Sequence, residues 1–311
     1  MGPALGLTLS RDGSLLLAAT APHSVAFIDV GRAIAGAPDA VLGYQSLGAV
    51  AGTIELALSG DGRFLFAANE NSSSVSVINV RNALRSDFAA SAVIGQIPVE
   101  RAPVGLAVSP DDAHLFVTNE QAKAGTPGYN PNACTLPAGT LGPQGTITVV
   151  DVRRAEISPA TSVVSRAYAG CVPVRIELSR TGDIGWVSAR ASNQLEAFSI
   201  ERLLVDPAQA LISTTPVGPA PVGLQLFAEG RLIAVANSNR FTPAPGSVSI
   251  VSTKRALNHQ PATQKTFNVG LFPRQWALSG DGTLLLLTEF SASRLDIFEV
   301  PALLQGGPEG D

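Results

Sequence analysis

The sequence has few of the residues on which reactive or metal-binding sites most often depend. Its 311 residues include two cysteines, three histidines and one methionine. It contains no Cys-x-x-Cys pair, no histidine pair at ligand spacing, no glycine-rich phosphate loop and no Gly-x-Ser-x-Gly nucleophile elbow. Without a convincing nucleophile–histidine pair, covalent hydrolysis is disfavoured.

Charged and aromatic residues are also scarce, at 15% and 5% of the chain, and the net charge is -4. Because no basic run with interleaved aromatics occurs, we expect no nucleic-acid partner. No apolar stretch approaches the roughly 18–20 residues that span a bilayer, so we expect no membrane partner. The first four residues lack the basic and apolar regions of a signal peptide. The first repeat already starts at Ala4, which leaves open whether an upstream segment was removed, and with it the localisation.

The sequence is rich in apolar residues and in the glycine and proline that are typical of turns. Forty-five per cent of the residues are apolar, and there are 30 glycines and 22 prolines. One segment recurs along the chain at intervals of roughly 50 residues, with one interval of about 70. In each copy an apolar stretch ends in Ser-x-Asp-Gly or a variant, which favours a tight hairpin, and a second apolar stretch follows. The copies span 4–21, 53–70, 102–120, 173–190, 221–238 and 273–290.

Each copy begins a unit of four predicted strands. A third strand follows a short polar loop, a short helical connector comes next, and a fourth strand closes the unit, as over 74–80, 80–87 and 92–97. Units of such short strands bury their faces by stacking around an axis. We therefore expect an all-β, six-bladed β-propeller of four-stranded antiparallel blades, forming a single domain over 1–311. The last repeat stops after its connector, so we expect its blade to have three strands.

The run Phe116-Val117-Thr118-Asn119 nearly spells the name of a propeller repeat family. The repeat as a whole resembles the YVTN-type propeller repeat, and this resemblance covers almost the whole chain. It implies the propeller fold but leaves the activity open, because propellers carry many unrelated functions. Related families usually have seven blades, whereas this chain has six first strands.

The long interval contains an insertion over 121–145, rich in glycine, proline, asparagine and threonine. We expect a loop on the face where the links between blades lie, placed to cover the mouth of the propeller. Cys134 lies in this insertion, and Cys171 lies in the link between the third and fourth blades, on the same predicted face. A Cys134–Cys171 disulfide is geometrically reasonable and would indicate secretion or another oxidising compartment. Two unrelated free thiols are the alternative.

Residues that depart from the repeat pattern are expected near one end of the propeller axis. Four residues before the closing serine, three copies have glycine and the others have Glu55, Arg175 and Gln275. In the neighbouring position, Arg274 replaces an aliphatic residue. A charge near a blade interface is costly unless it is paired or hydrated, so each of these residues is a candidate for a site.

Further candidates come from the same strands and from the loops at that end. Glu177 and Gln225 interrupt an otherwise small or hydroxylic position two residues before the closing serine. The loops add polar residues that would line the mouth: Asn69, Asn119, Arg190, Asn237 and Glu289. Concave mouths with a few convergent polar groups are the default small-molecule sites. A hydrated channel with internal Arg–Glu pairs, and asparagines that only form turns, are the alternative interpretation.

Three functions fit this pattern, and the first is an enzyme without cofactor or covalent intermediate. Arg175 and Arg274 would bind a keto or oxyanion oxygen of a hydrophobic small molecule, with Glu55 or Glu177 as proton carrier. Such a site suits proton-assisted dehydration followed by cycloaddition. The six blades and arginine-rich mouth resemble the propeller hetero-Diels–Alderases of tropolone–sesquiterpene biosynthesis. That resemblance implies a natural-product cyclase.

The other two functions are a hydrolase and a scaffold. A lactonase-like hydrolase would bind a calcium-like ion through glutamate and asparagine oxygens, although Arg175 and Arg274 would repel a dication. A non-catalytic binding scaffold would instead use an exposed side or bottom surface. Metal analysis distinguishes the hydrolase, and substitution of the two arginines distinguishes the scaffold.

Overall fold

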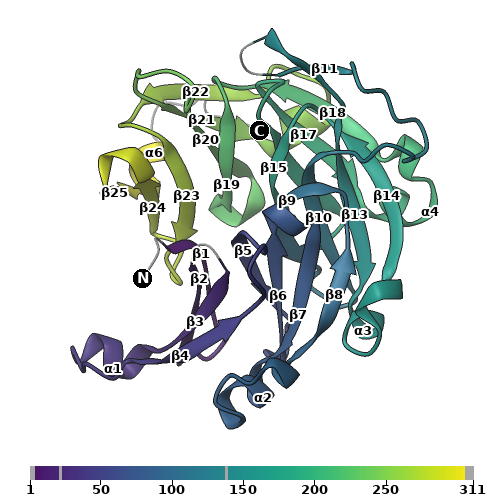
Figure 1. Cartoon of the computed structure of the whole chain (residues 1–311). Coiled ribbons are helices and arrows are strands. Elements are labelled where there is room, and N and C mark those ends of the chain that lie inside the picture. The colour runs from purple at the N-terminus through teal and green to yellow at the C-terminus, as the bar shows by residue number, and fades with distance from the viewer. Residues whose placement is uncertain (1–3, 21–22, 137–138, 305–311) are drawn as a thin grey trace. The chain divides into compact units, whose positions relative to one another are not determined.

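The computed structural model describes residues 4–20, 23–136 and 139–304, and these form short antiparallel strands joined by hairpins (Figure 1). Within these ranges, five sheets have four strands and one has three. The predicted all-β class and the four-stranded antiparallel units are confirmed. None of the helices in these ranges has the length and apolar character needed to cross a membrane.

The chain forms two compact units. Unit 1 comprises the chain up to residue 126 together with 146–166, and unit 2 comprises 127–145 together with the chain from 167 onwards. Unit 1 contains the first two sheets and most of the third. Their strands are β1 (Ala4–Leu9), β2 (Leu15–Thr20), β3 (Ser24–Asp29), β4 (Val41–Ser46), β5 (Thr53–Leu58), β6 (Phe64–Asn69), β7 (Ser74–Asn79), β8 (Val93–Pro98), β9 (Arg101–Val108), β10 (His114–Gln121), β13 (Gly145–Asp151) and β14 (Val163–Ala169).

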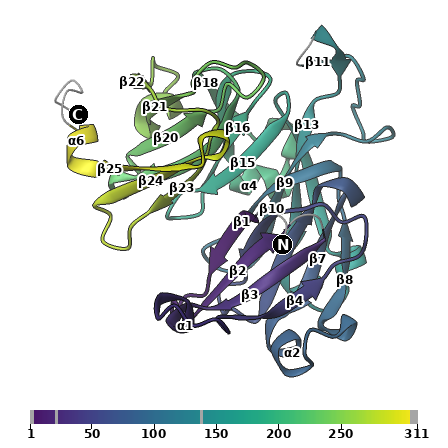
Figure 2. The ribbon, with the colours of Figure 1, turned by 60° about the vertical axis from the view of Figure 1, so that its left-hand side comes forward.

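Unit 2 contains the fourth, fifth and sixth sheets, of which the sixth lies at the yellow end of the colour scale (Figure 2). It also holds a short hairpin of the insertion, β11 (Cys134–Thr135) with β12 (Leu141–Gly142). The remaining strands are β15 (Pro173–Leu178), β16 (Ile184–Ala189), β17 (Gln194–Ser199), β18 (Leu211–Pro216), β19 (Pro221–Phe227), β20 (Leu232–Asn237), β21 (Ser247–Ser252), β22 (Thr263–Asn268), β23 (Pro273–Leu278), β24 (Leu284–Glu289) and β25 (Arg294–Glu299).

The hairpins between first and second strands are built by the Ser-x-Asp sequence in the first, second, third and sixth sheets, and by variants of it in the fourth and fifth, as predicted. In the sixth sheet, Asp281 accepts hydrogen bonds from the Ser279 hydroxyl and from the Thr283 amide and hydroxyl. These bonds to the charged form lower the pKa of Asp281 to about 2. Gly282 then takes the left-handed conformation, with φ of 71°. The regular Asp-Gly pairs are therefore turn residues.

The helical connectors start where the last residue of a third strand caps the helix. Ser199, for example, accepts a hydrogen bond from the Arg202 amide at the start of α4. Each helix spans at most six residues: α1 (Val30–Ile34), α2 (Val80–Arg85), α3 (Val152–Ala155), α4 (Ile200–Val205), α5 (Thr253–Leu257) and α6 (Val300–Leu304). Short 3-10 turns occur at Glu70–Ser72, Ala90–Ala92, Pro159–Thr161, Pro207–Gln209, Ala228–Gly230 and Phe290–Ala292.

The apolar core lies between consecutive sheets. Between the fifth and sixth sheets, Val248 and Ile250 pack with Trp276, Leu285 and Leu287. Corresponding clusters join the first sheet to the second, the second to the third, and the fourth to the fifth. Face-to-face stacking of neighbouring sheets therefore places the first strands of the fourth, fifth and sixth sheets beside one another, and the candidate site lies on these strands.

Candidate functional site

The first strands of unit 2 each carry a β-bulge close to their start. The pairing register shifts after Pro173 in β15, after Pro221 in β19 and after Pro273 in β23. A bulge bends the strand and turns a side chain away from the regular alternation. Arg175 and Gln275 occupy the same position in the bulges of their strands.

Arg175 reaches Gln275 across the intervening sheet. Its Nε and Nη2 atoms each lie 3.4 Å from the side-chain oxygen of Gln275, and Arg175 is 7% exposed. Gly223 occupies the same position of the bulge in β19, between the two strands. A Cβ atom at Gly223 would clash with the backbone oxygen of Arg274. Glycine there lets β19 and β23 approach each other, and it adds no side chain between Arg175 and Gln275.

The backbone of Arg175 is fixed by the second strand of its own sheet. Its amide donates to the Ser188 hydroxyl at 3.1 Å, and that hydroxyl donates to the Val222 carbonyl at 2.7 Å. Ser188 is fully buried. A rigid strand, rather than a mobile loop, therefore positions the guanidinium group.

Arg274 stands in a position where the preceding sheets have a buried valine, Val174 and Val222. It is itself 8% exposed, and its guanidinium carbon lies 5.3 Å from the ring centre of Phe290. A cation over an aromatic face within about 6 Å is attracted by the ring. The departure from the repeat pattern thus places a second buried arginine on the first strands of unit 2, with an aromatic ring for support.

Glu177 and Gln225, two of the predicted site residues, bind each other. The Glu177 carboxylate accepts hydrogen bonds from the Gln225 side-chain amide at 3.0 Å and from the Leu226 backbone amide at 2.8 Å. Burial raises the pKa of Glu177 to about 7, and the bond from Leu226 opposes that rise. The carboxylate therefore joins β15 to β19, and it exchanges a proton near neutral pH.

Four predicted substrate-binding residues are buried inside their own sheets: Asn69, Asn119, Asn237 and Glu289, each 0–1% exposed. The three asparagine amides donate to serine or threonine hydroxyls of the third strand, as Asn237 does to Ser247 and Ser249. Glu289 accepts from the Gly270 amide and pairs with Arg294 at 2.9 Å. This arrangement favours a structural role for all four, since a ligand on the surface would not reach them.

The fourth sheet departs from this arrangement, which the sequence did not indicate. Its second strand ends in Ala189 instead of an asparagine, and Glu196 of the third strand lies against Ala189 and Gly170. Glu196 is buried, and its Oε2 atom has no hydrogen-bond partner among the described residues. Burial raises the pKa of Glu196 to about 7. The sequence feature that could have indicated the buried Glu196 is Ala189, because this small residue leaves room for the carboxylate.

Replacement of Glu196 by glutamine is expected to stabilise the protein at alkaline pH. With a folded pKa of about 7 against an ordinary value of 4.5, the folded protein holds the Glu196 proton more tightly than the unfolded chain. The contribution to stability is complete below pH 4.5 and is lost as pH rises through 7. Glu196→Gln removes this loss, worth about 3 kcal/mol at pH 8.

The measurement is urea unfolding of wild type and variant at pH 5 and pH 8. The exposed Glu201→Gln variant of α4 is the control and is expected to follow the wild type at both pH values. An equal shift of Glu196→Gln at both pH values would contradict the assignment of a buried, titrating carboxylate.

Glu55 belongs to unit 1, whereas Arg175 and Arg274 belong to unit 2. It is buried at the start of β5, where a Cβ atom on Gly6 would lie 2.7 Å from the Ile54 carbonyl oxygen. Gly6 thus has the same function as Gly223, because it lets the first strand of the next sheet approach. Within the described residues, no cluster of three or more His, Cys, Asp or Glu side chains has the arrangement of a metal site.

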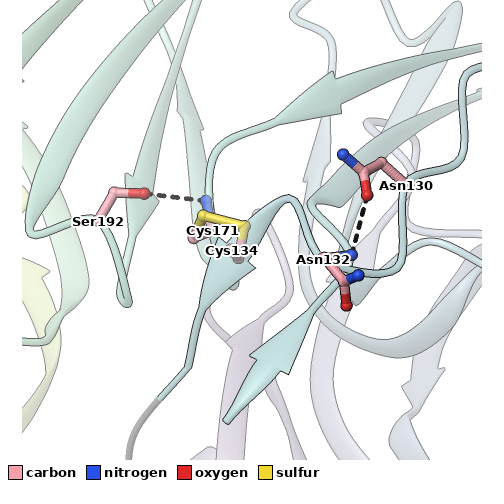
Figure 3. Close-up of a disulfide and its surroundings, with 5 residues drawn as sticks. All are labelled: Asn130, Asn132, Cys134, Cys171 and Ser192. Carbon is pink, nitrogen blue, oxygen red and sulfur yellow. Dashed lines mark hydrogen bonds between the residues drawn. A yellow bond between two sulfur atoms is a disulfide. The ribbon is translucent and has the colours of Figure 1, made fainter. Parts of the chain in front are cut away.

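The insertion is fixed at several points. In unit 1, the buried Glu100 accepts from the Lys123 amide at 2.6 Å and pairs with Arg166 at 3.2 Å. In unit 2, Cys134 and Cys171 form the disulfide whose geometry the sequence suggested, and the Cys171 amide donates to the Ser192 hydroxyl at 3.0 Å (Figure 3). Residues 137–138 of the insertion lie outside the described ranges.

Three phenylalanines of unit 2 that sequence reasoning did not single out lie next to the predicted residues: Phe241, Phe272 and Phe290. Phe241 lies between the predicted Arg190 and Arg240, with guanidinium-to-ring distances of 5.6 and 5.5 Å. The signal that would have found these phenylalanines is their scarcity, because aromatic residues make up only 5% of the chain. Although aromatic residues are rare in the chain, these three phenylalanines all occur in loops and links of unit 2.

Comparison with known proteins gives similarity in fold alone. No family model matches the chain, and no curated protein matches it. Among solved structures, hydrazine synthase from Kuenenia stuttgartiensis is 19% identical, with a TM-score of 0.72 over 99% of this chain and 80% of that one. A proposed 6-phosphogluconolactonase from Bacteroides uniformis is 13% identical, with a TM-score of 0.68 over 95% and 80%. The Cps50 (Swd1) β-propeller domain of Myceliophteria thermophila is 12% identical, with a TM-score of 0.65 over 96% and 83%. The chain is thus similar to β-propellers in fold, and its likeness to the YVTN-type repeat and to the cyclases stays a prediction.

Proposed function

We propose that the protein is a small-molecule enzyme that works without a cofactor, and that Arg175 and Arg274 bind an oxygen of its hydrophobic substrate. The observation that carries this proposal is the pair of buried arginines on first strands of unit 2. One contacts the Gln275 amide oxygen, and the other lies over Phe290. Buried, preorganised cations stabilise developing negative charge far better than solvated ones do.

The proposed reaction is dehydration followed by hetero-Diels–Alder cycloaddition. The hydroxyl of a hydroxymethyl group next to a ring hydroxyl gains a proton and leaves as water, its CH2 carbon stays on the ring, and the ring hydroxyl loses a proton, so the charge balances. The resulting C=C–C=O unit then adds across an alkene, forming one C–C and one C–O bond, with no oxidant or reductant. The arginines would polarise the ring oxygen in both steps, and orientation of the two partners would supply much of the acceleration.

Proton transfer in this scheme is assigned to a carboxyl group that is protonated part of the time at neutral pH. Glu177, with a pKa of about 7, has that property. Gln275 would orient Arg175, and Arg190 would contact the substrate. We also propose that the sheets close into a propeller of six blades, the last with three strands.

The test is a reaction mixture of a hydroxymethyl-substituted tropolone, α-humulene and purified protein in buffer with EDTA. The expected product is an adduct whose mass equals the sum of the two reactants less one water, formed faster than in buffer alone. A rate equal to that in buffer would overturn the proposal. Dihydrocoumarin hydrolysis that requires added calcium would instead support the lactonase-like alternative, and inactivity in both assays would favour the scaffold.

A further inference from the structure

A continuous series of arginine and phenylalanine side chains extends over unit 2. The guanidinium of Arg240 lies 5.5 Å from the ring centre of Phe241 and 5.1 Å from that of Phe272. Phe272 contacts Phe290 edge to face at 5.6 Å. Arg190 and Arg274 lie over the outer rings, Phe241 and Phe290. These six residues, three cations and three rings, are called the Arg–Phe surface below.

The local backbone brings these residues together. Arg240 and Phe241 lie in a loop of nine residues, 238–246, whereas the matching loops after β16 and β24 have four, 190–193 and 290–293. Longer loops of a repeat often carry its function. Phe272 has a φ of 52°, in the left-handed region that a bulky residue avoids. At the matching place in other copies, Ala102, Val172 and Ala220 have φ of 52°, 58° and 53°. The conformation therefore belongs to the repeat, and the aromatic side chain is the feature particular to this copy.

The Arg–Phe surface is exposed at Arg240, Phe241 and Phe290, whereas Arg190 and Arg274 are buried. Phe241 is 52% exposed and Phe290 is 44% exposed, and the neighbouring Leu271 is also open to solvent. No carboxylate pairs with Arg240 among the described residues. The chain as a whole has a net charge of -4. The patch thus combines exposed rings with the charge of Arg240, and exposed apolar patches often mark binding sites.

A second arginine–phenylalanine contact in the chain shows what a purely structural pair looks like. Arg63 lies 5.4 Å from the ring centre of Phe64, in unit 1. Its guanidinium is bound by Asp61 and lies 3.7 Å from Glu156. The charge of Arg63 is therefore compensated within the protein, and Phe64 is buried. Arg240 and Phe241 differ in both respects.

From this contrast we infer that the Arg–Phe surface recognises a flat, conjugated molecule that carries a negative charge, and that this is the substrate class of the proposed site. Recognition of such a molecule does not depend on the proposed function, whereas its being the substrate does. Exposed rings offer stacking area, and guanidinium groups bind an oxyanion with directed hydrogen bonds. Arg274 belongs both to the proposed site and to the Arg–Phe surface, so a ligand bound on the surface lies next to the arginine that would polarise it.

The test compares two fluorescent probes that differ in charge. 8-Anilinonaphthalene-1-sulfonate has a conjugated ring system with a sulfonate, and N-phenyl-1-naphthylamine has the same rings without it. Dissociation constants of both probes are measured by fluorescence titration for wild type, Arg240→Gln and Phe241→Leu. Arg240→Gln is expected to weaken binding of the sulfonate about fivefold or more and to change binding of the neutral probe less than about twofold. Phe241→Leu is expected to weaken both.

Two control variants make the result specific. Arg63→Gln removes an arginine from the compensated pair and is expected to leave both dissociation constants unchanged. Ile297→Ser removes an exposed apolar side chain of β25 and reports any probe bound to that sheet face. If Arg240→Gln has no larger effect than Arg63→Gln, the inference is wrong, whether or not the cycloaddition is observed. If the sulfonate binds as expected but no adduct forms, the binding role of the Arg–Phe surface is supported and the proposed reaction is wrong.

Discussion

Replacement of Arg175 by methionine is expected to lower kcat for adduct formation at least about a hundredfold, the usual cost of removing one preorganised donor from a buried site. Methionine has a similar length and is apolar, so the first strand of the fourth sheet is expected to keep its packing. Arg175→Lys is expected to recover little, because a single ammonium cannot replace the planar guanidinium that contacts Gln275 through Nε and Nη2. The measurement is the steady-state rate of the humulene–tropolone reaction.

The control for this substitution lies on the same strand pair. Arg180 is exposed in the hairpin between β15 and β16, and Arg180→Met removes the same charge away from the site. It is expected to retain the wild-type kcat. Equal losses in the two variants would show that net charge, rather than the position of Arg175, determines the rate.

Removal of the disulfide by Cys134→Ser with Cys171→Ser is expected to lower the free energy of unfolding by about 4 kcal/mol. The two cysteines are 37 residues apart, and closing a loop of that length in the unfolded chain accounts for a change of this size. The bond also holds the insertion to the link before β15, the strand of Arg175. Guanidinium chloride unfolding of the oxidised protein and of the double variant measures the difference.

Reduction provides the matching control for the disulfide. Dithiothreitol is expected to lower the unfolding midpoint of the wild type to that of the double variant and to leave the double variant unchanged. If the oxidised wild type and the double variant unfold at the same denaturant concentration, the bond contributes nothing to stability, and the insertion is held by its other contacts.

The sequence allowed prediction of the sheets because local chemistry repeats along the chain. The Ser-x-Asp-Gly turns, the capping residues of the connectors and the apolar alternation all recur, and each acts over a few residues. Arg274 was recognisable for the same reason, since it stands where other copies have an aliphatic residue. A departure from a repeat is visible without any knowledge of the fold.

The contacts between candidate site residues were not predictable in the same way. Asn237 and Glu289 were expected to line a mouth, but third-strand hydroxyls and Arg294 bind them inside their sheets. Those partners are ordinary serines and an exposed arginine, which no pattern marks. The Glu177–Gln225 bond and the buried Glu196 likewise depend on which side chains meet between strands. The sequence shows that the residue at a position is unusual, but it does not show which side chains form hydrogen bonds or ion pairs with it.

The most direct test of the arginine pair is a crystal structure of the protein soaked with tropolone, a flat ring with two adjacent oxygens. Density for the ring is expected on unit 2, with an oxygen at about 3 Å from a guanidinium nitrogen of Arg175 or Arg274. Tropolone bound elsewhere, with both guanidinium groups occupied by protein carboxylates in its presence, would contradict the account.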